Sequence, residues 1–462
     1  MPLPDLGLTG CLAAGFAAVG EVVLRRPSRS VAFANESMLV GMGVCAAALF
    51  PLTVAFPHRA VVAEAVLIGV GTAWAVSRRL RRSREPAEEN VNRPDPAAFA
   101  ILFVVVVVAA GFASLNFQYQ YLWDGFLIWA TKAQLLFHSG GLTREWFKND
   151  LYDLRHLAYP PLIPLYEALL SLLRGGFDFD KLKPVFLVFY VSMLVGTYAA
   201  ARSTVSARLA AVATLLVCLV PALSTRFAAG AYADMPQAAF VAGVVAAGLA
   251  GRKESLPWLI GALTTVKAEG VLLAALACAG VLGFWLLESP HGLLRRGLAE
   301  RRAIAIVALF FLVRFAYVRW IAAPEFVYSG SLSTALERFP KAARLCLLQL
   351  LDPRQWGLFW PAFLAAALVL FIRGSNREKA LAAAAAAGLI LAVAPFLFTS
   401  WPMELQIEQA YFRLVAQLAP AAAVVMVCGY ARVAHGPVPR RSADAGTVRT
   451  RCRPTSAPDP GP

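Results

Sequence analysis

Charged residues are scarce in this chain of 462 residues. Asp, Glu, Lys and Arg make up 15% of it, against 59% hydrophobic residues and a mean hydropathy of +0.63. This composition excludes a soluble domain of the same length, because the surface of such a domain needs more charge. Runs of roughly 20 apolar residues, enough to cross a hydrocarbon core of about 30 Å, recur from end to end. Backbone groups in lipid must bond within their own segment, so these runs are expected to be helices. The sequence therefore predicts an all-α polytopic membrane protein with about 13 transmembrane helices.

Cysteine is sparse too, and its spacing carries no signature. The seven Cys residues form no CxxC pair, which excludes a disulfide framework and a cysteine metal site. Most of them lie inside apolar runs, at Cys45, Cys218, Cys278, Cys346 and Cys428. We interpret them as small core residues.

The net charge of +15 does not come from a basic face interleaved with aromatic residues. The basic residues gather in short clusters between apolar runs, which is typical of the cytoplasmic loops of a membrane protein. Nucleic acid is therefore excluded as a partner, and the membrane is the expected environment.

The basic clusters orient the predicted spans. The strongest, RRLRRSR at 78–84, is assigned to the cytoplasmic side, so the span 97–115 runs outward and the loop 116–158 faces the periplasm or the exterior. Residues 160–173 would reach only about 21 Å as a helix, so this segment is interpreted as re-entrant or interfacial. With that choice the later clusters are also cytoplasmic, at 202–208, 252–254, 291–302, 373–379 and the tail from Arg432. The predicted location is the inner or plasma membrane, crossed many times.

These assignments divide the chain into four parts. Transmembrane helices form the N-terminal part, at 1–96, and a membrane core with the outer loop 116–158 follows at 97–290. Further transmembrane helices with the outer loop 323–355 form the C-terminal part, at 291–435. The last part, at 436–462, is predicted to be a disordered basic cytoplasmic tail. Residues 255–287 are too many for a single span, so we predict a break at 264–270. A single span is predicted at 412–431, and residues 333–351 are predicted to form an amphipathic helix on the membrane surface.

Polar residues that are unusual beside apolar segments converge, in this topology, on the outer face. A charged side chain near the middle of a span costs on the order of 3 kcal/mol, so a shared polar cavity at the outer leaflet is the simplest explanation. The residues are Asp124, Lys132, His156, Tyr159, Asp234, Lys267, Glu269, Glu404, Glu408 and Arg413.

Asp124 opens the segment FLIWATKAQLLFH, whose apolar residues recur at helical spacing. This pattern predicts a helix in the first outer loop that lies in the membrane interface with its apolar side in lipid. Two interpretations of Asp124 stay open: its side chain caps that helix, or it takes part in chemistry. Asp234 could likewise cap the helix that starts near Pro236, and Lys267 with Glu269 could be an isolated surface pair.

Several motifs follow one another in a definite order. They are Asp124 after an aromatic residue, then Trp129 and Lys132-Ala133, then Tyr159-Pro160-Pro161, AYADMP at 231–236, TVKAEG at 265–270 and Tyr411-Phe412-Arg413. The first loop and the motifs after it resemble the bacterial branch of the C superfamily of integral-membrane glycosyltransferases. Relatives of that branch include the protein O-mannosyltransferases and the aminoarabinose transferase of lipid A. The similarity covers about residues 97–290.

The resemblance implies transfer of a sugar from a polyprenyl-phosphate donor to an acceptor hydroxyl on the outer face, with inversion. The acceptor would be a lipid, a glycan or a protein. A carboxylate within reach of that hydroxyl can take its proton, an effect worth about 10² to 10⁴ in rate. The leaving lipid phosphate needs cations, for which Lys267, Arg413, Lys132 and Arg338 are the candidates. The implied catalytic residues are Asp124, as general base, and Asp234; the implied substrate-binding residues are Lys132, Tyr159, Lys267, Glu269 and Arg413.

No cofactor is required by the sequence, and a divalent metal stays an open alternative because some relatives use one. His156 is the candidate ligand. Eukaryotic members of the family often carry two adjacent acids in the first loop, where this chain has Trp123-Asp124-Gly125.

Two other functions also stay open. A transporter or lipid flippase would be expected to show internal repeats, and charges or broken helices near the bilayer midplane; we find no repeat. A polymerase or ligase of surface polysaccharide usually has its large outer loop late in the chain, and the loop 323–355 keeps that alternative open.

Overall fold

The computed structural model describes most of the chain. The described residues are 3–27, 30–82, 95–118, 122–147, 156–227, 230–289, 291, 293–321, 331–399 and 401–435. Every element within these ranges is a helix, as the sequence predicted. The predicted disordered tail at 436–462 lies outside the described residues, and so do parts of both outer loops.

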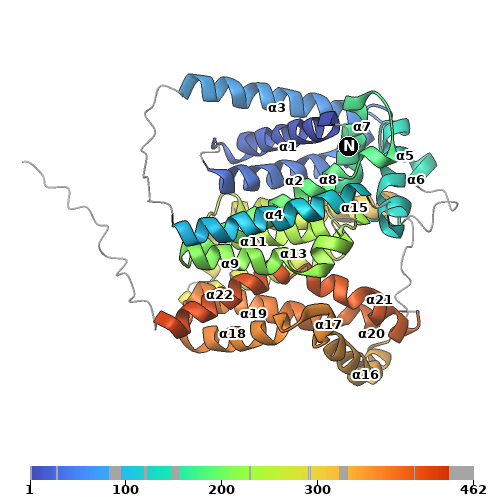
Figure 1. Cartoon of the computed structure of the whole chain (residues 1–462). Helices are drawn as coiled ribbons and strands as arrows, with labels where there is room; N and C mark the ends of the chain where they lie inside the picture. Colours follow the sequence, from blue (N-terminus) through green and yellow to red (C-terminus); the bar gives the residue numbers. More distant parts are fainter. Residues whose placement is uncertain are drawn as a thin grey trace, which may run out of the picture.

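The chain begins with four long apolar helices: α1 (Leu3–Leu24), α2 (Val31–Ala55), α3 (Ala60–Arg82) and α4 (Pro96–Gln118). They lie roughly parallel to one another in Figure 1, with the end of α3 and the start of α4 at the same end of the bundle. Ser30 begins α2, since its side-chain oxygen accepts a hydrogen bond from the Phe33 amide at 3.3 Å. The predicted span 97–115 corresponds to α4.

The middle of the chain alternates long helices with short ones. The short elements are η1 (Gly125–Ala130), α5 (Thr131–Ser139), α6 (Arg144–Phe147), η3 (Phe179–Lys181) and η4 (Ala222–Phe227). The longer ones are α7 (Leu162–Arg174), α8 (Pro184–Arg202), α9 (Ala207–Cys218), α11 (Asp234–Leu249), α12 (Leu256–Leu263) and α13 (Gly270–Glu288). α5, α6 and α7 gather at the end of the bundle opposite to the end of α3 (Figure 1).

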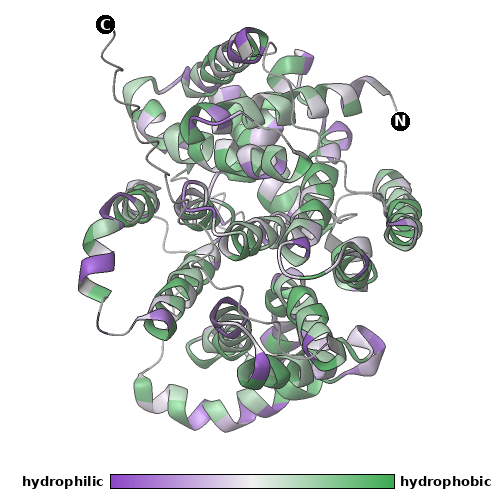
Figure 2. Cartoon of the chain, turned by 90° about the vertical axis from the view of Figure 1, so that its left-hand side faces the viewer, coloured by the Kyte–Doolittle hydropathy of each residue, from purple (hydrophilic) through white to green (hydrophobic). Residues whose placement is uncertain are grey.

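The C-terminal part contains α14 (Leu293–Ala299), α15 (Arg301–Ile321), α16 (Leu332–Leu350), α17 (Pro353–Trp356), α18 (Phe359–Arg373), α19 (Asn376–Leu391), α20 (Ala394–Leu397), α21 (Met403–Ala416) and α22 (Ala419–His435). α16 and α21 lie at the same end as α5 to α7 (Figure 1). Viewed down the bundle, most helices are seen end-on and are largely hydrophobic, whereas the helix at the bottom lies across them and alternates in hydropathy (Figure 2). A helix at 333–351 was predicted from the sequence; its place on a membrane surface stays a prediction.

Eight helices in the described ranges are long and apolar enough to cross a membrane, and α21 with α22 would make a ninth if that bent pair is one span. Shorter apolar helices accompany them at Ala207–Cys218, Asp234–Leu249 and Phe359–Arg373. The chain is therefore a polytopic helical membrane protein, and the total of about 13 spans stays a prediction.

The predicted span at 412–431 is wrong in its boundaries. α21 ends at Ala416, α22 begins at Ala419, and the two are bent by 55°. Pro420 lies in the first turn of α22, where its missing amide proton is tolerated, whereas continuing α21 through this proline would lose a hydrogen bond. The bend brings the end of α21 into the polar region described below.

The predicted break in 255–287 is confirmed. α12 ends at Leu263 and α13 begins at Gly270, with a turn between them that carries Lys267. The two helices approach closely at Gly270, because a Cβ added there would lie 1.9 Å from the Leu263 carbonyl oxygen. Only glycine fits this contact without a shift of the backbone.

The substitution Gly270→Ala is expected to lower the unfolding temperature and to weaken any activity that depends on Lys267, because the turn must open to accept the methyl group. Gly283→Ala is the matched control, since Gly283 lies on the same helix and a Cβ added there would meet no atom within 4 Å. Alanine there should be neutral or stabilise the helix by up to about 1 kcal/mol. Thermal unfolding of both purified variants measures the difference, and equal unfolding temperatures would contradict the close contact.

Candidate active site

Arg413, near the end of α21, lies at the centre of a charged cluster drawn from distant parts of the chain. One terminal guanidinium nitrogen donates to Asp124 Oδ2 at 2.5 Å and to Asp234 Oδ2 at 2.9 Å. Its Nε also donates to Asp234 Oδ2, at 3.1 Å. The side chains of Arg413 and Asp124 are 17% and 16% exposed, so both reach solvent only in part.

Asp234 is fully buried in this cluster, with a side-chain exposure of 0%. Its Oδ1 accepts hydrogen bonds from Lys267 Nζ at 3.1 Å and from Gln417 Nε2 at 2.7 Å. Its Oδ2 is bonded to Arg413. Asp234 is the first residue of α11 but makes no capping hydrogen bond, so the capping interpretation is wrong. Both carboxylate oxygens are instead used to hold cations.

Lys267 joins Glu269 to the same cluster. Its Nζ lies 3.2 Å from Glu269 Oε1, and its side chain is only 5% exposed. Burial lowers the pKa of Lys267, but the charges of Asp234 and Glu269 outweigh burial and raise the pKa above its ordinary value. Lys267 is therefore a buried, charged ammonium, and the interpretation of this pair as an isolated surface pair is wrong.

Two residues of the cluster were missed from the sequence. Gln417 lies one helical turn beyond Arg413 and reaches Asp234 beside it. Tyr232 lies under Arg413, with the guanidinium carbon 4.5 Å from the ring centroid. The spacing of four residues between Arg413 and Gln417 could have indicated that both side chains lie on one face of a helix. A single glutamine at the end of an apolar segment does not by itself indicate a functional residue.

Asp124 sits at the start of a π-helical turn, η1, with helical backbone angles and no capping hydrogen bond. Capping therefore does not account for it. The helix after it does not place its apolar side in lipid as predicted, because Trp129, Ala133 and Leu136 are buried against the protein. α5 packs on α7, which covers this side. Asp124 therefore begins a segment that is packed against the rest of the protein, not a helix that lies freely in the membrane interface.

Lys132 and Tyr159 belong to a second group beside the cluster. Lys132 is 1% exposed, and its Nζ donates to the carbonyl oxygens of His156 at 2.9 Å and Tyr159 at 3.2 Å. The same Nζ lies 4.9 Å from the centroid of the Trp129 ring. Lys132 thus ties η1 and α5 to the turn before α7.

The other charged residues predicted at the outer face lie apart from these bonds. Glu404 forms an ion pair with Lys341 of α16, and Arg338 donates to the Thr399 carbonyl oxygen at 2.7 Å. Glu408 is exposed on α21. Within the described part of the chain, none of these residues forms a hydrogen bond or ion pair with Asp124 or Asp234.

A divalent metal does not fit the residues around Asp124. The carboxylate of Asp124 is paired with the guanidinium of Arg413, and Lys267 is paired with the neighbouring carboxylate of Asp234. A metal ion at Asp124 would therefore be repelled by two cations. Within the described ranges, no three His, Cys, Asp or Glu side chains are grouped so as to hold a metal.

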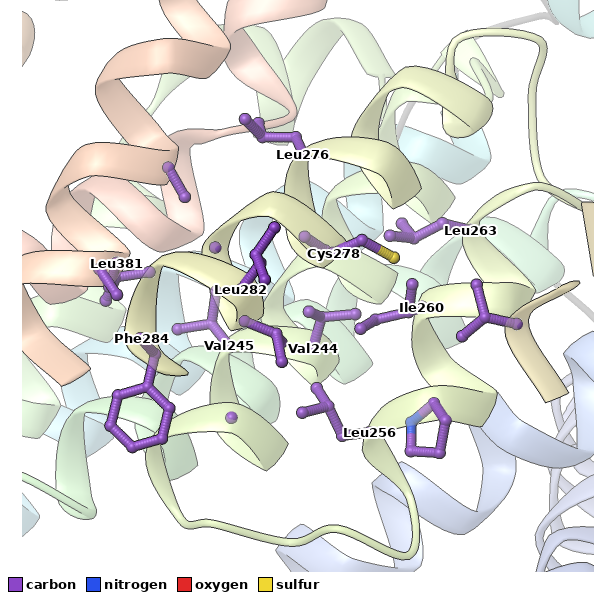
Figure 3. A pocket seen from close by; sticks show the side chains of 18 of the residues that line it. Val244, Val245, Leu256, Ile260, Leu263, Leu276, Cys278, Leu282, Phe284 and Leu381 are labelled. Atoms are coloured by element: carbon purple, nitrogen blue, oxygen red, sulfur yellow. The ribbon is translucent and has the colours of Figure 1, made fainter. Parts of the chain in front are cut away.

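An apolar cavity of about 580 Å³ lies between α11, α12, α13, α15 and α19. Figure 3 shows its aliphatic lining, including Val244, Ile260 and Leu276. A second, smaller cavity is lined by Glu269 and Gln417 of the charged cluster and shares Leu273, Leu276 and Leu418 with the first. The two cavities are therefore neighbours, and the smaller one, of about 30 Å³, reaches the cluster at Glu269 and Gln417.

The fold and the cluster define a polytopic helical membrane protein with a charged site at one end of its bundle. No family model matches the sequence, and no curated protein matches it. Among solved structures, the chain is similar to the crystal structure of ArnT from Cupriavidus metallidurans bound to undecaprenyl phosphate, with 18% sequence identity. The match covers 72% of this chain and 77% of that chain, and the TM-score is 0.38.

Proposed function

We propose that this protein is a membrane glycosyltransferase that moves a sugar from a polyprenyl-phosphate donor to an acceptor hydroxyl, with inversion and with Asp124 as the general base. The acceptor is a lipid, a glycan or a protein. The site faces the periplasm or the exterior of an inner or plasma membrane. The observation that carries the proposal is a partly exposed carboxylate, Asp124, bonded to a cation of a buried cluster at which an apolar cavity ends.

The proposed step is a single displacement at the anomeric carbon. The acceptor oxygen bonds to that carbon from the face opposite to the phosphate, and the bond between the carbon and the phosphate oxygen breaks. The hydroxyl proton goes to the Asp124 carboxylate, and the electron pair of the broken bond stays on the lipid phosphate. Asp124 is suited to this role because its side chain is in part accessible to an acceptor.

The leaving phosphate gains negative charge, which the two cations of the cluster are placed to offset. Arg413 keeps one terminal guanidinium nitrogen outside its bonds to Asp124 and Asp234, which can donate to a phosphate oxygen, and Lys267 supplies a compact charge. Both are already held by Asp234, so little side-chain freedom is lost when the phosphate binds. Asp234 itself is fully buried and fully bonded, so we assign it to positioning these cations rather than to proton transfer.

The apolar cavity fits the hydrocarbon part of the donor. Its lining is mostly apolar, with Lys253, Glu300 and Arg377 as its charged members, and the smaller cavity beside it reaches Glu269, next to Lys267. A lipid with its phosphate at Lys267 and Arg413 could therefore place isoprene units in the cavity. The predicted core at 97–290 would supply most of this site, with Arg413 and Gln417 added from the C-terminal part.

Transfer of label from radiolabelled polyprenyl-phosphate sugars, by the purified full-length protein in lipid nanodiscs, tests the proposal. We expect a labelled product that depends on an added hydroxyl acceptor and that has the opposite anomeric configuration to the donor. A transporter or flippase would move the intact lipid across proteoliposomes without breaking the sugar–phosphate bond. Intact donor after incubation with all acceptor classes would overturn the proposal.

A further inference from the structure

The turn from His156 to Tyr159 has an unusual backbone. His156 has φ of +48°, in the left-handed region that residues with a Cβ rarely adopt. Strained residues of this kind persist only where the surrounding structure holds them, and they gather at functional sites. The side chains around this turn are therefore expected to hold it in place.

Four consecutive carbonyl oxygens of the turn accept hydrogen bonds from three side chains. Lys132 Nζ donates to the carbonyl oxygens of His156 at 2.9 Å and Tyr159 at 3.2 Å. The Tyr317 hydroxyl lies 2.7 Å from the Leu157 carbonyl oxygen and 3.2 Å from that of Tyr159. Arg314 donates to the Ala158 carbonyl oxygen at 2.5 Å. Arg314 and Tyr317 come from α15, which carries no motif. Such complete bonding fixes the turn in its strained form.

The imidazole of His156 is held in a stack of rings. It lies nearly parallel to the Tyr159 ring, with centroids 5.0 Å apart and an interplanar angle of 20°. Tyr159 in turn stacks on Trp129 at 5.7 Å and 30°. His156 is the partly exposed member of the stack, while Trp129 is 1% exposed. The stack therefore ends in an imidazole of fixed orientation.

The turn that carries this imidazole is tied to the charged cluster. The backbone amide of Leu162, just after the turn, donates to the Thr265 carbonyl oxygen at 3.3 Å, which ties the turn to the segment carrying Lys267 and Glu269. Burial lowers the pKa of His156 to about 4, with a further lowering by Lys132 and Lys267 that Asp124 and Glu269 oppose. At neutral pH the ring is therefore uncharged and can both donate and accept a hydrogen bond.

We propose that His156 is a substrate-binding residue that hydrogen-bonds a hydroxyl group of the transferred sugar or the acceptor beside Asp124, and that Arg314 and Tyr317 are positioning residues that hold its turn. This inference rests on the proposed glycosyl transfer and adds a specificity contact to it. A neutral imidazole at this place suits a neutral hydroxyl, because it does not compete with Arg413 and Lys267 for the phosphate.

Three substitutions at position 156 separate the ring from the backbone. His156→Phe keeps the stacked ring but removes its hydrogen bonds, and His156→Gly relieves the backbone strain but removes the ring. His156→Asn keeps polar hydrogen-bonding groups and tolerates the left-handed backbone. We expect His156→Phe and His156→Gly to raise the KM for the substrate whose hydroxyl group His156 binds by about tenfold, with little change in kcat. In His156→Asn this KM should return most of the way to the wild-type value.

His138→Phe is the matched control, since His138 is exposed on α5 and also contacts a neighbouring ring, Phe137, in an edge-on arrangement. It should leave KM unchanged. Wild-type KM in both His156→Phe and His156→Gly would overturn the His156 assignment and leave the proposed function standing. The His156 assignment would also be overturned if KM rose only in variants whose unfolding temperature is lowered and His156→Asn did not restore it. Absence of transfer by the wild-type protein would overturn the proposed function and this inference together.

Discussion

Asp124→Asn is expected to slow sugar transfer by about 10²- to 10⁴-fold, the usual loss when a general base is removed. Asparagine has nearly the same shape as aspartate but cannot take the proton of the acceptor hydroxyl. Arg413 keeps Asp234 as its partner in this variant, so the fold and the donor site should persist. The measurement is kcat and KM with a radiolabelled polyprenyl-phosphate sugar, together with binding of the unlabelled polyprenyl phosphate.

Loss of kcat with unchanged binding of the lipid phosphate supports the role of Asp124 as base. Turnover equal to that of the wild type would remove the assignment, whatever the other variants do. Glu269→Gln serves for comparison, because Glu269 is also a partly exposed carboxylate of the cluster but is paired with Lys267. It should act mainly on donor binding, through the charge it places beside Lys267.

The helices of this fold were predictable because the lipid imposes their length. An apolar run near 20 residues has few alternatives to a helix, and a run as long as 255–287 has to break. The break was placed correctly at Lys267 because the charged residues there do not belong within lipid. The bend between α21 and α22 was missed, since Pro420 at the first turn of a helix looks in sequence like a proline inside one.

The meeting of Asp124, Asp234, Lys267 and Arg413 follows the predicted topology, which placed all four loops at one end of the bundle. What each side chain does there was not predictable. Lys132 was expected to bind substrate but donates to two backbone carbonyls, a choice that depends on where the turn at 156–159 folds back. Arg314 and Tyr317 were missed because, within an apolar helix, they resemble ordinary interfacial residues.

The largest effect on stability is expected from Asp234→Ala. Asp234 is fully buried and is shared by Lys267, Arg413 and Gln417. Removing one partner from a buried ion pair typically costs about 3 to 5 kcal/mol, because the remaining charge is left in a poorly solvated place. Here Lys267 and Arg413 would keep only Glu269 and Asp124, which are partly exposed. We therefore expect an unfolding free energy lower by about 3 kcal/mol or more.

Thermal unfolding in detergent, followed by tryptophan fluorescence, measures this loss. Glu404→Ala is the matched control, since Glu404 pairs with Lys341 on the exposed side of the same helix, α21, that carries Arg413. Solvent screens such a pair, so its removal should leave the unfolding temperature unchanged. Asp124→Asn should also unfold like the wild type, because Arg413 stays paired with Asp234. If Asp234→Ala unfolds like these two variants, the two cations do not depend on Asp234, and the positioning role assigned to that carboxylate is wrong.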